Sequence, residues 1–555
     1  MLKEKHSYWL GILFCLFFYP GNAIGVTDIP ATTESLMATV ERVLEEGPVL
    51  DWPQIERLYD KQHHRFIWHH AGKLTAQGRQ LFRWLASADL DGLDADDYHL
   101  DHIRGLVFSS SPDVLVYREL LLSDGYLRLA RDLRLGRYDA HTLDPLWMLP
   151  GEDFDPVDAL SSALSSGSLE QLLNTLRPTN NAYLQLKGAL AKYRHIQAVG
   201  GWITLQVDNK LQLGDRNPGV SNLRRRLSVE SIHTEGEVSD PNYFDAGLEL
   251  AVKRFQQRFG LLPDGIVGVA TLRALNDPVE RRIEQIRVNL ERWRWLPHEL
   301  ESQHLMVNTA GFEIMLVKHD RIVFRKRTVN GRMERQTPSF SSQVTHLVMN
   351  PSWTVPRTIA VQDILPKLQQ DSEYLANKQL RVYARSDGEW LEIDPIDIDW
   401  ADYDDDNFPF VLRQDAGNKN SLGRIKFHMP NSHQIYLHDT PSPGLFERPN
   451  RAYSSGCVRV EAAEQLAQLL VKYAEQPHEE WLQQALSSGE TRITSLAKPM
   501  PIYLTYFTSW VDTKGDIHFR PDVYHRDTAL MLVMDEGINP NISPGRLEKK
   551  LTSSF

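Results

Sequence analysis

The spacing of apolar residues changes once along this chain, near residue 300. From about residue 26 to residue 200 apolar residues recur every three or four positions, as in 36–44 and 120–135, which predicts amphipathic helices. From His304 short stretches such as 312–317 alternate or run apolar, which predicts strands. The 555 residues, 42% hydrophobic and 24% charged, have globular composition and exceed one ordinary domain. We therefore predict a multidomain α+β protein, helical in its N-terminal part and β-rich in its C-terminal part.

The first 23 residues have the pattern of an export signal. Lys3 and Lys5 precede an apolar run over residues 9–19, and Pro20, Gly21 and Ala23 follow. The run is about half the ~20 residues that a membrane-spanning helix needs, so we predict a signal peptide over residues 1–23, with an uncleaved anchor as the alternative.

If the signal is removed, Cys457 is the one cysteine that stays, because the other, Cys15, lies in the apolar run. A lone thiol in an exported protein either fills a buried apolar site or acts as a nucleophile. Its surroundings favour the nucleophile: Cys457 follows a turn of small residues at 453–456, ahead of a helix that we expect from Glu461. His438 precedes it in the stretch 435–440.

The net charge and the positions of the histidines and acidic residues limit which binding partners and metal sites we expect. The net charge is −12, and −13 without residues 1–23 (which carry Lys3, Lys5 and Glu4), so we do not expect nucleic acid or an anionic membrane surface as the main partner. Adjacent side chains on a helix point in different directions, so at the histidine pairs 63–64 and 69–70 we expect a solvated helix face and no metal site. The acidic run 397–406 lacks the ligand spacing of a calcium loop and is expected to be a solvated surface.

Residues 211–276 contain two apolar helical stretches, then a loop with Asp264, Gly265 and Gly268 before a third short helix. This segment resembles the small three-helix peptidoglycan-binding module. A helical spacer is the alternative. An amphipathic helix with its arginines largely off the apolar stripe is expected to follow, over 278–300.

The stretches 329–338 and 349–356, His438, and Ser455-Gly456-Cys457-Val458-Arg459 resemble the YkuD-type catalytic domain of L,D-transpeptidases. The order of parts is similar to the large Gram-negative members, and the stretches 92–99 and 510–520 add to the likeness. Many members have a second histidine where this chain has Ser455. The resemblance implies periplasmic location, no metal or organic cofactor, and the following segments: signal peptide 1–23, helical scaffold 26–200, peptidoglycan-binding-like module 207–277, linker helix 278–300, catalytic domain 301–530 with an inserted lid at about 365–423, and a tail 531–555.

The chemistry of the pair Cys457 and His438 follows from the residue types. A thiol near its ordinary pKa is only a few per cent thiolate at neutral pH, so Cys457 needs a base, and His438 is the nearest motif histidine. We expect backbone N–H groups around Gly456 and Cys457 to stabilise an oxyanion, Ser455 to help hold the turn, and the dipole of the following helix to act on the sulfur.

Other candidates surround this pair. Arg459 either binds a substrate carboxylate or pairs internally, and Tyr436 should share the strand face of His438 and form a substrate wall. Trp353 lines the cleft or fills a core. His428 and His433 are weaker candidates for the base. Asp439 adjoins His438 without necessarily reaching it, so the group that orients His438 is left unassigned.

The resemblance implies acyl transfer through a Cys457 thioester on tetrapeptide stems of peptidoglycan, giving 3→3 cross-links. The partners expected are stem peptides, with glycosyltransferases or carboxypeptidases as further candidates. A hydrolase on the same fold (an L,D-carboxypeptidase or amidase) and a non-catalytic wall-binding scaffold are the alternatives. A papain-like protease is disfavoured because its cysteine precedes its histidine, whereas here His438 comes first.

Overall fold

The computed structural model describes residues 50–109, 111–207, 210–233, 239–371, 373–386, 388–474 and 479–535. The predicted signal peptide with Cys15, and most of the predicted tail, lie outside these residues. Within the described part of the chain, no helix has the length and apolar character needed to cross a bilayer. The multidomain α+β fold is confirmed: helices fill the N-terminal part, and a large sheet follows from residue 303.

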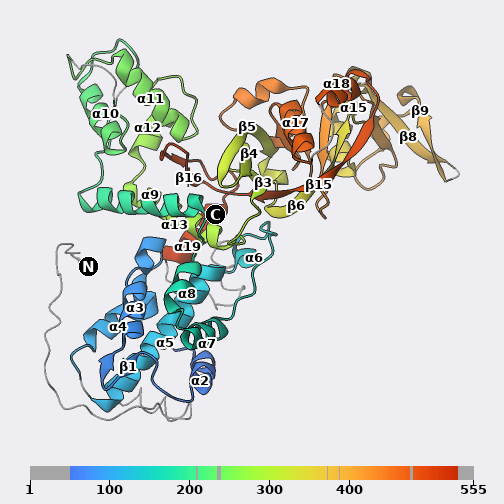
Figure 1. Ribbon diagram of the computed structural model, residues 1–555. Helices are drawn as coiled ribbons and strands as arrows, with labels where there is room; N and C mark the ends of the chain where they lie inside the picture. Colours follow the sequence, from blue (N-terminus) through green and yellow to red (C-terminus); the bar gives the residue numbers. More distant parts are fainter. Residues whose placement is uncertain are drawn as a thin grey trace. The chain divides into compact units, whose positions relative to one another are not determined.

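The smaller of two compact units comprises residues up to 88, 94–129 and 155–172. The long helix α5 runs through its centre with Leu120, Leu121 and Tyr126 fully buried (Figure 1). Side chains that accept backbone N–H bonds start the helices: Asp51 caps α2 and Thr75 caps α3. The elements are α2 (Trp52–Lys61), β1 (His69–His70), β2 (Lys73–Leu74), α3 (Ala76–Leu85), η2 (Ala95–Tyr98), α4 (Leu100–Gly105), α5 (Pro112–Leu135, continuing into the larger unit), α7 (Pro156–Ser166) and the start of α8 (Leu169–Thr175).

The histidine pairs do not lie on a helix, contrary to the prediction. His63 and His64 have positive φ in the turn after α2, and His69 and His70 form β1. The His69 ring is buried with Nδ1 2.6 Å from a carboxylate oxygen of Glu119. His69 is therefore a core residue paired with Glu119, and it does not lie on a solvated face.

The larger unit, residues 89–93, 130–154 and 173 onward, begins with helices. Three of them, α10 to α12, form the module that resembles a peptidoglycan-binding domain. Its core includes Leu223, Val252 and Phe255, and the Gln256 side chain holds the predicted loop by accepting from the N–H of Gly265, where φ is +78°. The helices are η1 (Ala88–Asp91), α6 (Ala140–Leu143), α9 (Asn181–Ala198), α10 (Pro218–Val229), α11 (Ala246–Arg258), α12 (Val269–Asn276) and α13 (Val279–Arg294).

Helix α13 is buried on nearly all sides, so the prediction that its arginines lie largely away from the core is wrong. Arg282, Arg292 and Arg294 are each less than 9% exposed. Each has an acid partner: Asp277, Asp527 and Glu291, respectively. Paired guanidinium groups can be buried, and an apolar-stripe analysis does not see their partners.

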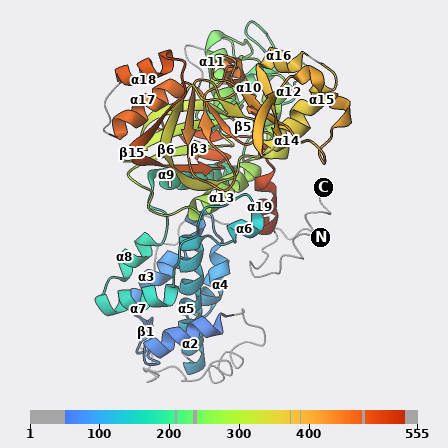
Figure 2. The same ribbon diagram turned by 90° about the vertical axis from the view of Figure 1, so that its right-hand side faces the viewer.

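From residue 303 the chain forms a nine-stranded sheet in the order β13-β5-β14-β12-β11-β6-β15-β3-β4, and β4 also pairs with β5, which closes the sheet on itself. Helices α17 and α18 cover it, burying Leu466, Leu470 and Leu482 against strand residues (Figure 2). The elements are β3 (Gln303–Asn308), β4 (Glu313–Lys318), β5 (Arg321–Gly331), η3 (Met333–Arg335), β6 (Phe340–Met349), β11 (Ile425–His428), β12 (Leu437–His438), η7 (Pro443–Glu447), β13 (Ala452–Ser454), β14 (Val458–Val460), α17 (Ala463–Tyr473), α18 (Glu479–Ser487) and β15 (Arg492–Thr505).

From the sequence, the apolar stretches 502–506 and 517–519 predict a hairpin that completes the domain, and the structure differs. Residues 502–505 belong to the long strand β15, which pairs with β6 and β3 inside the sheet. The hairpin is formed instead by β16 (Ser509–Val511) and β17 (Ile517–Phe519). Helix α19 (Arg526–Asp535) follows, so the expected start of a tail at residue 531 falls within a helix.

The predicted lid forms a subdomain of its own between β6 and β11. A four-stranded sheet, β7-β10-β8-β9, and short helices enclose a separate apolar core that spans Val355 to Leu412. The exposed acidic run of residues 397–406 lies on its surface. The elements are β7 (Trp353–Thr354), α14 (Arg357–Ile359), η4 (Ala360–Ile364), α15 (Leu365–Leu368), α16 (Tyr374–Lys378), β8 (Leu380–Ser386), β9 (Glu389–Ile393), η5 (Pro395–Asp397), η6 (Trp400–Asp402) and β10 (Val411–Gln414).

Candidate active site

The register of two neighbouring parallel strands brings the predicted residues together. In β12 and β14, Leu437 pairs with Val458 and His438 with Arg459. Leu437 and Val458 are fully buried in the core of the sheet. Because side chains alternate along a strand, residues 436, 438, 457 and 459 project together from the opposite face.

That face is the floor of a cleft of about 1530 Å³. Every site residue predicted from the sequence lines it: Trp353, Tyr436, His438, Ser455, Gly456, Cys457 and Arg459. The lid subdomain contributes one wall, including Lys367, Tyr374 and Lys378. The charge of the lining is opposite to that of the chain: among its described residues there are seven lysines and arginines, and Asp363 is the one carboxylate.

His438 is held as a neutral base. It is 4% exposed, and its Nδ1 lies 2.5 Å from the backbone carbonyl oxygen of Asp439, which can only accept, so Nδ1 carries the proton and Nε2 is left as the acceptor. Burial and the positive charge of Arg459 lower the pKa of His438 to about 3. The carboxylate of Asp439 accepts instead from the backbone N–H of Arg424, at 2.9 Å. The carbonyl is therefore the orienting group that was left unassigned.

Cys457 is half-buried, with Sγ 3.8 Å from the carbonyl oxygen of Gln434. Burial raises the pKa of its thiol above the ordinary value, and hydrogen bonds with Tyr436 together with the charges of Lys426 and Arg459 oppose that rise. At neutral pH Cys457 is thus a thiol and His438 a neutral imidazole. Positive charge is already in place to stabilise a thiolate as the proton leaves.

The turn before Cys457 is held by Ser454, where the sequence had suggested Ser455. The Ser454 hydroxyl accepts from the Gly456 N–H at 3.1 Å and donates to the Cys457 carbonyl at 2.5 Å. Gly456 has φ +111°, which favours glycine. The Ser455 hydroxyl accepts from Arg335 at 3.0 Å, and Arg335 pairs with Asp363 of the lid.

Two expectations about the electrostatics of this turn are corrected. The Gly456 N–H is already bonded to Ser454, so it is not free for an oxyanion; the Cys457 N–H has no hydrogen-bond partner among the described residues. The chain after Cys457 is strand β14, and α17 begins only at Ala463, so no helix N-terminus adjoins the sulfur. Val458 and Val460 point into the core on alternate positions, which is a strand pattern.

Family models match three segments. Residues 302–478 match the L,D-transpeptidase catalytic domain family, known as YkuD. The chain carries an L,D-transpeptidase catalytic domain. Residues 53–190 match a scaffold domain family, and residues 216–275 match a peptidoglycan-binding domain family. The resemblance drawn from the motifs is thereby confirmed.

Two curated proteins are similar to parts of this chain. One of Haemophilus influenzae, named "Putative L,D-transpeptidase", is 35% identical over 253 residues, 45% of this chain and 49% of that protein. The N-acetylmuramoyl-L-alanine amidase CwlM of Mycobacterium tuberculosis is 43% identical over 74 residues, 12% of this chain and 18% of the amidase. The chain therefore spans at most about half the length of these relatives.

Two solved L,D-transpeptidase structures also match. One from Xylanimonas cellulosilytica is 14% identical and covers 54% of this chain and 98% of its own, with a TM-score of 0.18. One from Stackebrandtia nassauensis is 11% identical and covers 54% of this chain and 95% of its own, with a TM-score of 0.21. Such TM-scores are too low to support an argument about the fold.

The remaining predicted residues of the catalytic domain have clear positions. The Tyr436 ring lies 5.8 Å from the His438 ring, as expected for one strand face, with Lys426 Nζ 3.9 Å from its centroid. Trp353 is half-buried, packs against the lid core and also lines the cleft. The Arg459 Nε is buried without a hydrogen-bond partner in the described structure, which disfavours internal pairing.

His428 and His433 line the same cleft as Cys457 and His438. His428 stacks on His346 of the neighbouring strand at 4.2 Å, and His433 lies beside Phe340. Lys426, which contacts Tyr436, was missed from the sequence. Its signal was the alternation in residues 425–428, where Ile425 and Phe427 are buried. Within the described residues, no group of three metal-ligating side chains forms a metal site.

Proposed function

We propose that this protein is an L,D-transpeptidase that forms 3→3 cross-links in peptidoglycan through a thioester on Cys457. The observation that supports it most is the arrangement of His438 and Cys457. They project from adjacent strands into one cationic cleft, with the His438 Nδ1–H bonded to a carbonyl so that Nε2 is available as a base.

The first half of the reaction is acylation. Cys457 Sγ attacks the amide carbonyl between residue three and the terminal D-Ala of a tetrapeptide stem, while His438 Nε2 takes the thiol proton. The Cys457 N–H donates to the carbonyl oxygen as it gains negative charge. His438 then gives its proton to the leaving amine of D-Ala, which departs and leaves a thioester.

The second half is transfer to an acceptor amine, proposed to be the side-chain amine of diaminopimelate on a neighbouring stem. The amine attacks the thioester carbonyl and loses a proton to His438. The new amide forms as the Cys457 sulfur leaves, and His438 returns the proton to it. No metal or organic cofactor has a step in this cycle.

The charges of the cleft fit such a substrate. Stem peptides carry carboxylates, and the lysines and arginines of the lining provide opposite charge over the whole cleft. Arg459, with its buried Nε unpartnered, is the group that we assign to a substrate carboxylate. Tyr436 and Trp353 form apolar walls beside the reacting atoms.

The other segments have roles consistent with this activity. We propose that residues 207–277 bind the cell wall, that residues 1–23 direct export, and that the enzyme works in the periplasm, where its substrate lies. Residues 26–200 form the scaffold, residues 278–300 the linker, and residues from 301 through α19 the catalytic domain. Glycosyltransferases and carboxypeptidases are proposed as partners because they make the strands and stems on which it acts.

The proposal is tested by incubating the mature protein and its Cys457→Ala variant with disaccharide-tetrapeptide and following the products by mass spectrometry. We expect a cross-linked dimer that has lost one D-Ala, absent with the variant, and fragmentation that assigns a 3→3 bond. Tripeptide without dimer would replace the proposal with a hydrolase. Unchanged tetrapeptide in both samples would favour a wall-binding scaffold.

A further inference from the structure

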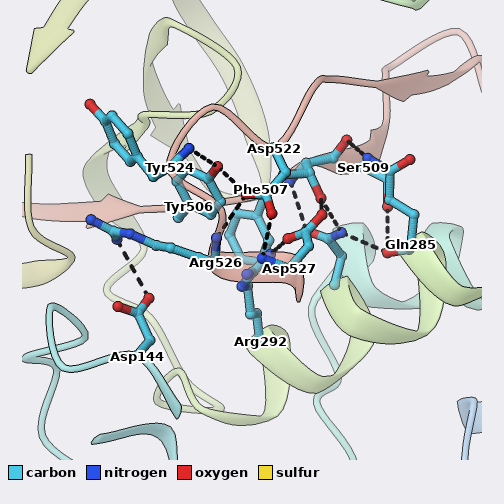
Figure 3. Close-up of polar contacts among 12 residues, drawn as sticks. Asp144, Gln285, Arg292, Tyr506, Phe507, Ser509, Asp522, Tyr524, Arg526 and Asp527 are labelled. Carbon is cyan, nitrogen blue, oxygen red and sulfur yellow. Dashed lines mark hydrogen bonds and ion pairs between the residues drawn. The ribbon is translucent and has the colours of Figure 1, made fainter. Parts of the chain in front are cut away.

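A buried arginine from outside the matched catalytic segment lies behind the active-site loop. Arg526 begins α19, well beyond residue 478, where the family match ends. It is 7% exposed, and its guanidinium lies near the rings of Tyr506 and Tyr524 (Figure 3). It does not line the cleft, so it has no direct access to substrate.

Arg526 binds the loop that connects β5 to β6. Its Nε and Nη2 donate to the side-chain oxygen of Gln336 at 3.1 and 3.0 Å, and Nη2 also donates to the Thr337 carbonyl at 3.1 Å. Nη1 donates to the Ser339 hydroxyl at 3.3 Å. Nearby, the Tyr524 hydroxyl donates to the Gly331 carbonyl at 2.6 Å. Tyr524, just before α19, and Arg526, its first residue, therefore bind the two ends of this loop.

The loop in turn holds the peptide bond that precedes the nucleophile. The Thr337 hydroxyl, fully buried, accepts from the Gly331 N–H at 2.9 Å and donates to the Gly456 carbonyl at 2.8 Å. That carbonyl belongs to the same planar peptide unit as the Cys457 N–H, and in a trans peptide the two bonds point in opposite directions. Fixing the carbonyl therefore fixes the direction of the one unpaired amide at Cys457.

The positive charge of Arg526 is balanced on its far side. Asp144 lies 3.5 Å from Nη1 and is 5% exposed. The segment that contains Asp144 also pairs with the loop: Ser339 donates its N–H to Leu146 and accepts from Met148. Leu146 lines the cleft. Arg526 thus contacts two segments, the β5–β6 loop and the segment that contains Asp144, and both segments border the cleft.

We infer that Arg526 is a positioning residue for acyl transfer, which acts through Gln336 and Thr337 to aim the Cys457 N–H at the oxyanion. The inference rests on the proposed use of Cys457 as an acyl acceptor. It does not depend on which acyl donor is used. Removing an oxyanion donor outright costs about 10²- to 10³-fold in rate, so loosening its support should cost about tenfold.

The alternative is that Arg526 is only a buried ion pair that stabilises the fold. Arg292 is a matched control (Figure 3). It is also buried, and it pairs with Asp527, the residue that follows Arg526 in α19. Asp527 also accepts from Thr508 at 2.6 Å. Within the described part of the chain, Arg292 contacts Asp527 and the Tyr506 ring and does not reach residues 331–339, so a change there disturbs α19 without touching the loop.

The test compares Arg526→Lys with Arg292→Lys in the full chain, using p-nitrophenyl acetate as the acyl donor. Attack by the Cys457 sulfur releases p-nitrophenolate and leaves an acetyl thioester, with the thiol proton going to His438. Cys457→Ala gives the background. Iodoacetamide alkylation, which forms no oxyanion, reports whether the sulfur itself is unchanged, and the melting temperature reports stability.

We expect Arg526→Lys to acetylate about tenfold more slowly with an unchanged iodoacetamide rate, and Arg292→Lys to acetylate at the wild-type rate even if it melts lower. The acetylation rate of Thr337→Val should fall as much as that of Arg526→Lys. The rate of the double variant should fall no further, because the two residues act through the same series of hydrogen bonds to the Gly456 carbonyl. The inference would be overturned if Arg526→Lys were acetylated at the wild-type rate. It would also be overturned if the loss of acetylation rate followed the loss of melting temperature in both arginine variants, or if the wild type were not acetylated. A wild type that is acetylated but does not turn over tetrapeptide would instead count against the proposed function.

Discussion

At the scale of single residues, the site depends on groups that bind backbone rather than on side chains that pair with each other. His438 is oriented by a carbonyl, and the turn before Cys457 is held by the Ser454 hydroxyl. A sequence motif identifies the nucleophile and base by type. It cannot show which of two adjacent serines faces back into the turn, since that depends on backbone torsions such as φ +111° at Gly456.

The two serines give a matched test of this distinction. Ser454→Ala removes the acceptor of the Gly456 N–H and the donor to the Cys457 carbonyl, so we expect acetylation of Cys457 to slow about tenfold, the equivalent of about 1.4 kcal/mol. Ser455→Ala removes one bond from Arg335, which keeps Asp363, and should stay within about twofold of wild type. Stopped-flow release of p-nitrophenolate measures both, and the reverse order would contradict the assignment of the turn.

The charge of Lys426 should set how readily the thiol ionises. Burial raises the pKa of Cys457 and Lys426 opposes the rise, so Lys426→Met should raise that pKa further. The thiolate is the species that reacts with iodoacetamide; its fraction at pH 8 falls, and alkylation should slow about fivefold. The rates of variant and wild type should converge at pH values above both thiol pKa values.

Lys419→Met is the control for Lys426, because Lys419 lines the same cleft but is not among the groups that shift the pKa of Cys457. Its alkylation profile should overlay that of the wild type. Equal slowing by the two substitutions would mean that the general charge of the cleft matters, and not the position of Lys426.

At the scale of elements, the sequence predicted the change from helices to strands near residue 300, and it failed where a partner lies far along the chain. Strand β15 contains Pro499 and Pro501, which argue against a central strand. Pro499 lies in a register shift between Ser495 and Met500, whereas Pro501 lies in the paired stretch opposite Gln343. The buried arginines of α13 were missed for a related reason: Asp527, which pairs with Arg292, lies 235 residues away.

The lid should be removable as one piece. Its core spans residues 355–412 and shares no buried residue with the core of the main sheet, while Thr354 and Arg413 are directly paired across antiparallel strands. Replacing residues 355–412 by Asn-Gly, which favours a two-residue hairpin turn, should leave a folded enzyme. We expect p-nitrophenyl acetate to react within about threefold of wild type and tetrapeptide turnover to fall about tenfold, because the substrate wall is lost.

Steady-state kinetics with both substrates and a thermal melt measure the outcome of this excision. Loss of the cooperative melt would show that the sheet depends on the lid. Unchanged tetrapeptide turnover would show that the wall formed by Lys367 and Lys378 does not bind substrate.

At the scale of the whole molecule, the family models match three consecutive segments, which suggests three independent domains. Within the larger unit, however, the matched segments share a core. The module that resembles a peptidoglycan-binding domain and the β16–β17 hairpin share one apolar core. The Phe519 ring lies tilted at 5.4 Å from Phe259 of the module and edge-on at 5.6 Å from Tyr193 of α9. Arg520 donates to the carbonyl of Arg258, and Arg258 donates to the carbonyl of Ile517. The sequence motifs predicted the order of these parts along the chain. A local sequence pattern does not show that the module and the hairpin pack against each other.

This shared core predicts that the module and the catalytic sheet unfold together. Phe519→Ala empties a site that is 1% exposed and should cost about 3–5 kcal/mol of unfolding free energy in a single transition. Trp390→Ala, at a site 51% exposed, is the control and should change it by less than about 0.5 kcal/mol. Calorimetry that resolved a separate module transition, unaffected by Phe519→Ala, would refute the coupling.

The central claim, that Cys457 carries the acyl group, is tested most directly by intact-protein mass spectrometry after rapid mixing with a tetrapeptide stem and acid quenching. We predict that the protein gains the mass of the tripeptide acyl group, and that proteolysis assigns it to the peptide containing Cys457. His438→Ala should reduce the fraction modified by at least about 100-fold. Free D-Ala and cross-linked product formed at the normal rate by Cys457→Ala would contradict the account.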